Sequence, residues 1–149
     1  MTTQTRRMNR GDLVEVGLLS GELGYPLDAA EALHRFEALS PEKHGLFVAE
    51  DSGHVVGWIH VSAEESLTDE PKSLIDALIV GETSRSRGIG RLLVAEAESW
   101  ASARGHRTLR VRTRVTRERA HDFYRRAGFV LDKTQHVFDK NLAGGRKTL

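Results

Sequence analysis

The sequence predicts a mixed α/β fold in which helices pack against a central sheet. In some segments apolar residues recur every three or four positions, as on one side of a helix, and in others they alternate or run together, as in strands. The expected order is one strand, two helices, three strands, a helix, a strand, a helix and two strands. No repeat, low-complexity run or linker interrupts the 149 residues, so a single domain over 1–149 is expected.

Two helices are expected in the N-terminal part, over residues 12–23 and 27–39. Asp12 opens the first stretch and Asp28 is the second residue of the other, and each has a glutamate three positions later, a pattern typical of a capped helix start. Apolar residues then recur at helical spacing in both stretches. The residues between them, 20–26, contain glycine, proline and Tyr25, and they indicate a turn.

Three strands are expected next. Residues 45–50 and 54–62 are short β-branched and aromatic segments, and the glycine-containing residues between them indicate a hairpin. Residues 73–80 form an almost unbroken apolar run, which is typical of a central strand covered on both faces. Between these strands, residues 64–71 form an acidic loop.

The C-terminal half alternates helices and strands. A third helix follows a glycine-containing turn and ends at Gly105, and residues 108–115 alternate apolar residues or threonine with arginine, like a half-exposed strand. A fourth helix is expected over 118–128, where a glycine stops it. Two further strands, 129–133 and 136–142, are expected to follow it.

Composition and charge exclude several classes of function. Cysteine is absent, which excludes disulfides, thiolate metal sites and a cysteine nucleophile, and no apolar run approaches the roughly 20 residues of a membrane span. The start of the chain has no apolar signal segment, so a cytoplasmic protein is expected. Net charge is +1, but residues 1–80 hold 14 acidic and 6 basic side chains, and residues 81–149 hold 7 and 16.

A glycine turn directly follows the apolar strand. Its pattern is R-x-x-G-x-G, with an arginine after it, and its members are Arg85, Ser86, Arg87, Gly88, Ile89, Gly90 and Arg91. Free amide groups at the start of a helix, together with the helix dipole, favour an anion such as a phosphate. No Gly-Lys-Ser/Thr is present for a P-loop, and Leu93 stands where a dinucleotide fingerprint needs a third glycine.

Residues 75–101 and 120–129 together resemble the GNAT superfamily of N-acetyltransferases, and the agreement extends over roughly residues 45–142. The resemblance implies a central, mostly antiparallel, twisted sheet of about six to seven strands flanked by about four helices. It also implies acetyl-CoA as cosubstrate, with its diphosphate held by the glycine turn, and no metal.

The same resemblance implies roles for individual residues. Tyr124 stands at the position of the family's usual general acid, although a core tyrosine beside Phe123 is the alternative. Main-chain groups of Leu78, Ile79 and Val80 stand where the family binds the pantetheine arm and the acetyl carbonyl. Arg117 replaces an asparagine that contacts the cofactor in many members, and an arginine can still bond a phosphate.

The general base is less clearly marked. Where many family members carry a glutamate, this chain has Leu74, and Asp76 shares its strand face. Asp76 is therefore the predicted base, with His60, Glu64 and Glu65 as other candidates, acting directly or through water. The other histidines show no metal-binding spacing and are expected at surface or packing positions: 34, 44, 54, 106, 121 and 136.

The acceptor is expected to be a small cationic primary amine that enters between Tyr25 and the acidic loop, with Glu64 and Glu65 among its contacts. A protein or peptide amine and a CoA-binding regulator without turnover are the alternatives. A nucleic-acid-binding module built on the arginines of 109–126 is a remote alternative, because net charge is near zero and few aromatic residues are interleaved. No nucleic-acid or membrane partner is therefore expected. A homodimer is the expected assembly.

Overall fold

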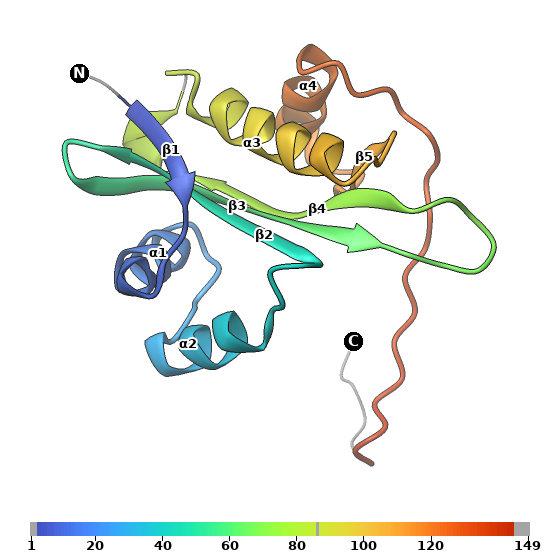
Figure 1. Ribbon diagram of the computed structural model, residues 1–149, viewed down its shortest axis with the longest axis horizontal. Coiled ribbons are helices and arrows are strands. Elements are labelled where there is room, and N and C mark those ends of the chain that lie inside the picture. The colour runs from blue at the N-terminus through green and yellow to red at the C-terminus, as the bar shows by residue number, and fades with distance from the viewer. Residues whose placement is uncertain (1–2, 86, 145–149) are drawn as a thin grey trace. The chain divides into compact units, whose positions relative to one another are not determined.

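The computed structural model describes residues 3–85 and 87–144, which form two compact units. The first unit ends at Arg112 and the second begins at Thr113 (Figure 1). The single domain over 1–149 stays a prediction.

The first unit is built on a five-stranded sheet whose strands lie side by side in chain order. Neighbouring strands run antiparallel except β4 and β5, which are parallel. The strands are β1 (Thr3–Arg7), β2 (His44–Asp51), β3 (His54–Glu64), β4 (Lys72–Val80) and β5 (Leu109–Val111). The expected strand over 108–115 is thus shorter than predicted, because β5 pairs only with the first part of β4.

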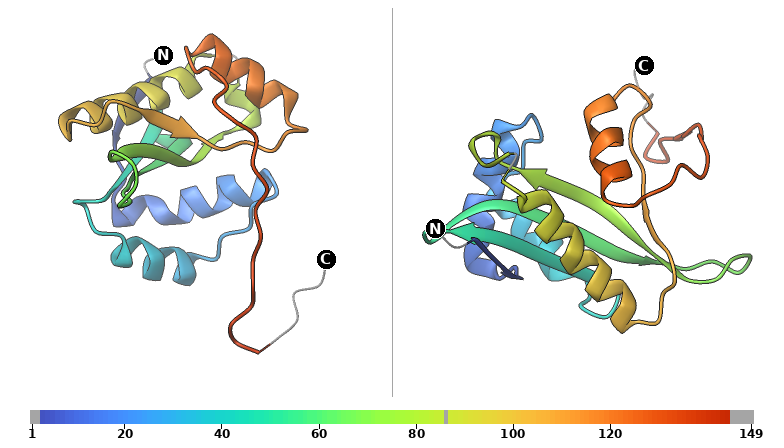
Figure 2. Two further views of the ribbon diagram at one scale, coloured as in Figure 1. Left: turned by 90° about the vertical axis from the view of Figure 1, so that its right-hand side faces the viewer. Right: turned by 90° about the horizontal axis from the view of Figure 1, so that it is seen from above.

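Helices cover both faces of this sheet. The helices α1 (Leu13–Glu22) and α2 (Ala29–Ala38) lie on one face, and α3 (Ile89–Ala103) lies on the other (Figure 2). Two short 3₁₀ helices, Arg10–Asp12 and Glu82–Ser84, precede α1 and α3. This layering confirms the prediction of helices on a central sheet. The end of β4 is followed, after Glu82–Ser84 and the glycine turn, by the start of α3.

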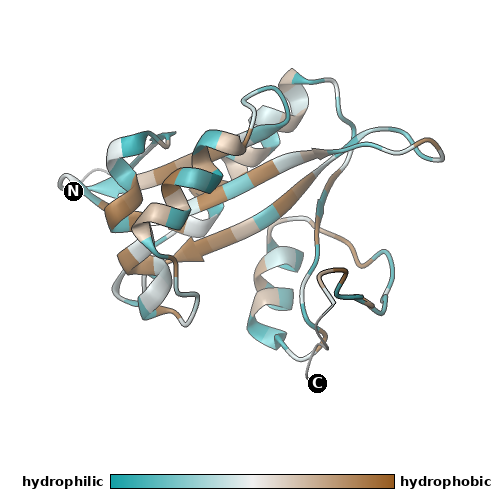
Figure 3. Ribbon diagram, turned by 90° about the horizontal axis from the view of Figure 1, so that it is seen from below, coloured by the Kyte–Doolittle hydropathy of each residue, from teal (hydrophilic) through white to brown (hydrophobic). Residues whose placement is uncertain are grey.

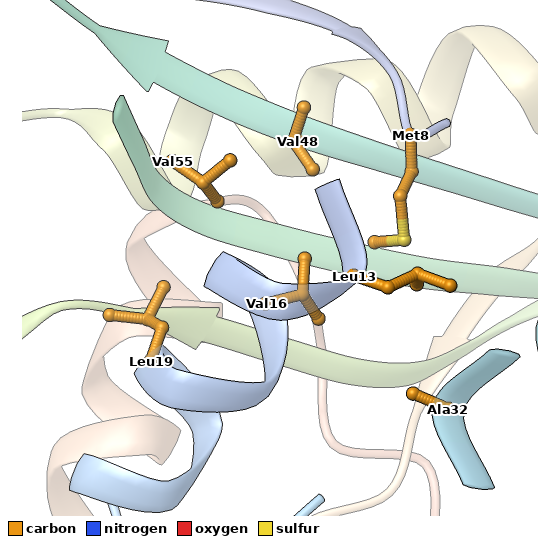
Figure 4. Close-up of a cluster of buried hydrophobic side chains, with 7 residues drawn as sticks. All are labelled: Met8, Leu13, Val16, Leu19, Ala32, Val48 and Val55. Carbon is orange, nitrogen blue, oxygen red and sulfur yellow. The ribbon is translucent and has the colours of Figure 1, made fainter. Parts of the chain in front are cut away.

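Two apolar layers hold the helices to the sheet, whose strands carry much of the hydrophobic colour in Figure 3. The layer under α1 and α2 is shown in Figure 4 and contains Met8, Leu13, Val16, Leu19, Ala32, Val48 and Val55. On the other face, a Cβ at Gly57 of β3 would lie only 3.1 Å from Leu93 and 3.3 Å from Ile89. Glycine therefore lets α3 approach β3 closely, and each fully buried aliphatic side chain there contributes about 1.5–3 kcal/mol.

The predicted helix caps divide into one that forms and one that does not. The Asp28 carboxylate accepts the Glu31 N–H at 3.2 Å and caps α2, as predicted. The predicted cap at Asp12 is wrong, because no side-chain bond caps α1 and this carboxylate pairs with Arg6 at 2.8 Å instead. The Asp12 oxygens accept from the Arg6 guanidinium and from the Asn9 N–H, at 2.7 Å, and Asn9 lies before the 3₁₀ helix rather than in α1.

A bulge interrupts the pairing of β3 with β4. His60 lies opposite Ala77 and Val61 lies opposite Ile75, so Asp76 is the extra residue on β4. A bulge bends its strand and redirects the side chain of the inserted residue. β4 leaves β5 at this same point, since Ile75 is the last β4 residue that pairs with β5.

The second unit contains one helix, α4 (Glu118–Arg126), in its described residues. The predicted strands over 129–133 and 136–142 are wrong, because the described residues from 129 to 141 form no strand. Among the residues that the structure describes, no strand pairs with this segment, and its apolar side chains are exposed: Val130, Leu131, Val137, Phe138 and Leu142. The sheet accordingly has five strands rather than the predicted six to seven.

Candidate functional site

The glycine turn forms an open helix start at the end of β4. Gly88 precedes α3 with a φ of 79°, in the left-handed region that favours glycine, and no atom lies within 4 Å of the place a Cβ would occupy. The first turn of α3 contains no acidic side chain. The first amide groups of this helix and its dipole therefore offer a site for an anion. Ser86, a predicted member of this site, lies outside the described residues.

The arginines of the turn differ in what they contact. Arg85 and Arg91 are exposed beside the turn. The Arg87 guanidinium donates to the Asp51 carboxylate at 3.0 Å, and Asp51 is only 7% exposed at the end of β2. This ion pair ties the glycine turn to the β2–β3 hairpin, so Asp51 supports the turn from a distant part of the sequence.

One edge of β4 is paired along its length, and the other is paired only at its start. β3 accompanies the whole strand, whereas β5 pairs with Ser73–Ile75 only. Beyond the strand, the Gly81 N–H donates to the Val56 carbonyl of β3 at 2.9 Å. Because successive N–H groups of a strand point to opposite edges, those of Leu78 and Val80 point away from β3. Two main-chain donors thus line the edge that β5 leaves open.

Three side chains from three consecutive strands meet at the bulge. The Nδ1 atom of His44 on β2 lies 2.9 Å from the Nε2 atom of His60 on β3. The same Nε2 atom lies 3.6 Å from the Oδ2 atom of Asp76 on β4. The two predicted base candidates, Asp76 and His60, are therefore in contact, and His44 joins them.

The His60 imidazole is adapted to stay neutral. Burial disfavours its charged form and lowers its pKa below the usual value, the Asp76 carboxylate opposes this in part, and His44 adds a smaller lowering effect. Its side chain is 18% exposed, compared with 32% for Asp76. A neutral imidazole beside a carboxylate can accept a proton, which a protonated one cannot.

The acidic loop carries less free charge than its sequence indicates. Glu64 pairs with Arg112 and lies 3.9 Å from Arg110, and the Arg112 hydrogen bond holds the pKa of Glu64 below its usual range. Glu65 pairs with Lys43 at 3.3 Å. A carboxylate stabilised by arginine is a weak base, so Glu64 is a poorer candidate for proton abstraction than His60 or Asp76.

The remaining predicted residues lie elsewhere. Tyr25 is 49% exposed in the connection between α1 and α2. Tyr124 belongs to the second unit, where its ring lies 5.1 Å from Phe123 and 5.4 Å from Phe129, between ring centroids. Burial raises the pKa of the Tyr124 phenol, and the nearby Arg117 opposes this in part. The phenol is therefore protonated at neutral pH and can donate.

Sequence reasoning missed His44 and Asp51. The sequence predicts a surface or packing position for His44 and places Asp51 in the hairpin turn. The hairpin itself offered a signal for His44, because antiparallel strands that turn at 51–54 bring residue 44 beside the segment 60–62. No local signal marks Asp51, since its partner Arg87 is far away in sequence.

The described residues contain no group of three or more His, Cys, Asp or Glu side chains that could hold a metal ion. Within those same residues, every helix is too short or too polar to cross a membrane.

Comparisons with known proteins agree with this architecture. Residues 17–129 match the model of the acetyltransferase (GNAT) family. An N-acetyltransferase of Methanocaldococcus jannaschii, itself uncharacterized, is 31% identical over 90 residues, which cover 59% of this chain and 40% of that protein. The chain thus spans less than half the length of this curated relative.

Solved structures share the fold over nearly the whole chain. A structure described as an acetyltransferase of Agrobacterium tumefaciens has a TM-score of 0.81 and 27% identity, covering 92% of this chain and 99% of that one. The aminoglycoside acetyltransferase AAC(6')-Iy, with a bisubstrate analog of CoA, has a TM-score of 0.82 and 21% identity, with coverages of 95% and 99%. Glucosamine-6-phosphate N-acetyltransferase of Arabidopsis thaliana has a TM-score of 0.81 and 18% identity, with coverages of 95% and 100%.

At identities of 21% and 18%, the likeness to the second and third structures shows the fold alone. The family model, in contrast, matches the sequence across most of its length. The predicted fold class and the predicted family are both confirmed. The chain belongs to the GNAT family of acetyltransferases.

Proposed function

We propose that this chain transfers the acetyl group of acetyl-CoA to a primary amine of a small acceptor, which attacks the thioester directly in a ternary complex. The observation that carries the proposal is the open edge of β4. This edge begins at the bulge of Asp76, continues past the Leu78 and Val80 amides, and leads to the helix start at Gly88. A long ligand with a polar arm and an anionic end fits such a line of donors.

The residues present fit acetyl-CoA in this position. The amide groups at Gly88, Ile89 and Gly90 would hold the diphosphate, with Arg85 and Arg91 adding positive charge beside it. The Leu78 and Val80 amides would bind the pantetheine arm in the manner of a neighbouring strand and donate to the acetyl carbonyl oxygen. Bound acetyl-CoA supplies an activated acetyl thioester.

Asp76 and His60 would prepare the acceptor. An alkylammonium group has a pKa near about 10.4, so the amine must lose a proton before it can attack. The Asp76 carboxylate, 32% exposed, would hold the ammonium group, and the neutral His60 imidazole behind it would draw the proton away. This division of labour replaces the glutamate that many family members carry at the position of Leu74.

Tyr124 would return a proton to the leaving thiolate. Its phenol remains protonated at neutral pH because burial raises its pKa. A phenol that is already protonated can donate without prior activation, whereas a surface carboxylate at neutral pH cannot.

The acceptor we propose is a small primary amine. Structural neighbours include proteins named as aminoglycoside and glucosamine-6-phosphate N-acetyltransferases, names that give small amino sugars as acceptors. Glu64 and Glu65 already pair with Arg112 and Lys43, so we propose that Asp76 rather than either of these two glutamates holds the ammonium group.

The test is a screen of polyamines, amino sugars, aminoglycosides and lysine-containing peptides with acetyl-CoA, in which released CoA thiol is detected. We expect at least one small amine to release thiol above background, and Tyr124→Phe to lower kcat by roughly tenfold to a hundredfold. Turnover of peptides alone would indicate a protein amine acceptor. Calorimetric binding of acetyl-CoA with no turnover on the whole panel would contradict catalysis and favour a CoA-binding regulator.

A further inference from the structure

We propose that residues 129–142 of one copy of this chain pair with β5 of a second copy, and that the exchange is reciprocal, so that two copies form a dimer. The proposal concerns assembly and does not depend on the proposed acetyl transfer. It rests on two features of the described residues: an apolar segment without a strand partner, and a strand, β5, without a neighbouring strand on its outer edge. The homodimer that the sequence predicts thereby gains a defined interface.

The C-terminal segment exposes apolar side chains that a sheet normally buries. Every described residue from 130 to 144 is exposed, and the segment forms neither helix nor strand up to residue 141 (Figure 1). A contiguous apolar surface on a soluble chain usually marks a place where something binds. The large apolar side chains of the segment are all at least 72% exposed: Val130, Leu131, Val137, Phe138 and Leu142.

The pattern of these side chains fits a sheet that is covered on both faces. Val130 is adjacent to Leu131, and Val137 is adjacent to Phe138. Adjacent residues of a strand point to opposite faces, so both members of each pair are buried only where both faces of the sheet are covered. The sheet of the first unit has this property, because α1 and α2 lie on one face and α3 lies on the other (Figure 2). The segment therefore has the character of a strand of such a sheet.

The segment lacks the turn that would let it fold back on itself as a hairpin. A tight hairpin turn needs residues with positive φ, usually glycine or asparagine. Between Gly128 and Gly144 no described residue has a positive φ, and the two predicted strands are separated by Thr134 and Gln135. The run from 130 to 142 is thus continuous and spans up to about 45 Å when extended, enough to reach a second copy.

β5 offers an open edge for this segment. It is the last strand of the sheet in the described residues, so β4 is its one strand neighbour there. The Thr108 carbonyl accepts from the Ser73 N–H of β4 at 2.9 Å. Because main-chain groups alternate in direction along a strand, those of Leu109 and Val111 point to the outer edge. β5 ends at Val111 although its alternating pattern continues to residue 115, and a neighbouring strand would extend it.

A second copy is the partner that satisfies both features at once. Each chain carries one strand-like segment and one open strand edge, so two copies related by a two-fold axis can exchange segments and leave neither exposed. A different protein would cover the segment but leave the edge of β5 open. The exchange uses the outer edge of β5, so it leaves free the edge of β4 that the proposed function assigns to acetyl-CoA.

The first experiment measures assembly by light scattering and sedimentation, and compares Phe138→Lys with Leu67→Lys. Leu67 is fully exposed in the loop between β3 and β4, so each change replaces an exposed apolar side chain with a charged one and should leave the single chain folded. We expect the wild type to be a dimer at micromolar concentrations. Phe138→Lys should raise the dissociation constant of this dimer by roughly tenfold or more, and Leu67→Lys should leave it unchanged.

A cross-linking experiment identifies the segment that residue 138 contacts. Phe138 is replaced by the photoreactive p-benzoylphenylalanine, and isotopically labelled and unlabelled copies are unfolded together and refolded as a mixture. Cleavage after glutamate releases β5 within the peptide 99–118 and the C-terminal segment within 119–149. We expect cross-links between these two peptides in which one is labelled and the other is not. The same photoreactive residue in place of Leu67 should give no cross-link to 99–118.

The outcomes decide between a second copy and the other partners. A wild type that is monomeric at micromolar concentrations overturns the exchange, and so do equal dissociation constants for Phe138→Lys and Leu67→Lys. Cross-links to 99–118 that never combine a labelled with an unlabelled peptide would show pairing within one chain and overturn it too. Mixed cross-links to a different peptide would overturn the pairing with β5. None of these results bears on acetyl transfer, which the thiol-release screen tests separately.

Discussion

The glycine turn and the His44–His60–Asp76 cluster represent two ways of building a site in one small sheet. The turn uses main-chain amide groups from a contiguous run of residues at the start of α3, and its requirements are a left-handed glycine and an empty space beside it. The cluster uses side chains from β2, β3 and β4, which meet because of strand register and a bulge at Asp76.

The difference lies in what a substitution can remove. Main-chain donors survive most side-chain changes, so the turn is sensitive mainly to backbone conformation and to the groups that hold it in place. A side-chain cluster loses its chemistry when one member is replaced. We therefore expect substitutions in the cluster to affect kcat and those around the turn to affect affinity for the cosubstrate.

The largest effect is expected from Asp76→Asn. An amide is isosteric with the carboxylate but cannot accept the proton or stabilise an ammonium group, so kcat should fall by roughly 10²–10³-fold. The affinity for acetyl-CoA, measured by calorimetry, should change by less than about twofold. A parallel loss of acetyl-CoA affinity would break the distinction between the two regions.

A smaller effect, on affinity rather than turnover, is expected from Asp51→Asn. This change removes the charge that holds Arg87, and the loss of a charge-assisted hydrogen bond should weaken acetyl-CoA binding about tenfold. Glu98→Gln, which removes an exposed carboxylate from α3, is the matched control.

The sharper version of this experiment uses acetylpantetheine, which has no diphosphate. Asp51→Asn should leave its KM unchanged if Asp51 acts by positioning the turn around a diphosphate. An equal loss with both thioesters would show that the substitution disturbs the fold generally.

Gly88→Ala should weaken acetyl-CoA binding severalfold. Alanine at a φ of 79° carries a strain of about 1–2 kcal/mol, and its relief would shift the turn. Gly53→Ala provides a close control, because Gly53 has a φ of 80° and equally open surroundings in the β2–β3 hairpin. Both variants should lose similar thermal stability, and a similar loss of acetyl-CoA affinity in both would contradict a specific role for Gly88.

The smallest effect is expected on the pH dependence of stability. The pKa of His60 is lower in the folded protein than in the unfolded chain, so the unfolded chain binds more protons as pH falls below about 6.5. Stability should therefore be fully present above this pH and decrease as pH falls toward the folded pKa. Thermal melts between pH 5 and 8 should show this decrease in the wild type and a weaker one in His60→Gln.

The sequence sufficed to predict the position of the turn, although not its support by Asp51, because the residues that form the turn are contiguous. The glycine spacing, the arginines and the apolar strand before them are contiguous, and so is the later motif around Tyr124. The same holds for the helices, where apolar spacing at Val16, Leu19 and Leu93 matches buried positions.

The cluster and the C-terminal strands depend on partners that are distant in sequence. His44 contacts His60 because of hairpin register, and Asp76, the extra residue of the β4 bulge, lies beside His60. The alternation of apolar residues over 129–142 indicates strands, but a strand forms only where a neighbour offers hydrogen bonds. The ion pair between Glu64 and Arg112 could likewise not be predicted from the sequence, because it arises from the packing of β3 beside β4 and β5.

The most direct measurement is amide hydrogen exchange at Leu78 and Val80, by NMR, with and without saturating acetyl-CoA. If the open edge of β4 binds the pantetheine arm, both amides should become strongly protected, while the amide of Gly105, just beyond the C-terminal end of α3, should exchange as before. Unchanged exchange at Leu78 and Val80 in protein saturated with acetyl-CoA would contradict binding of the pantetheine arm along this edge.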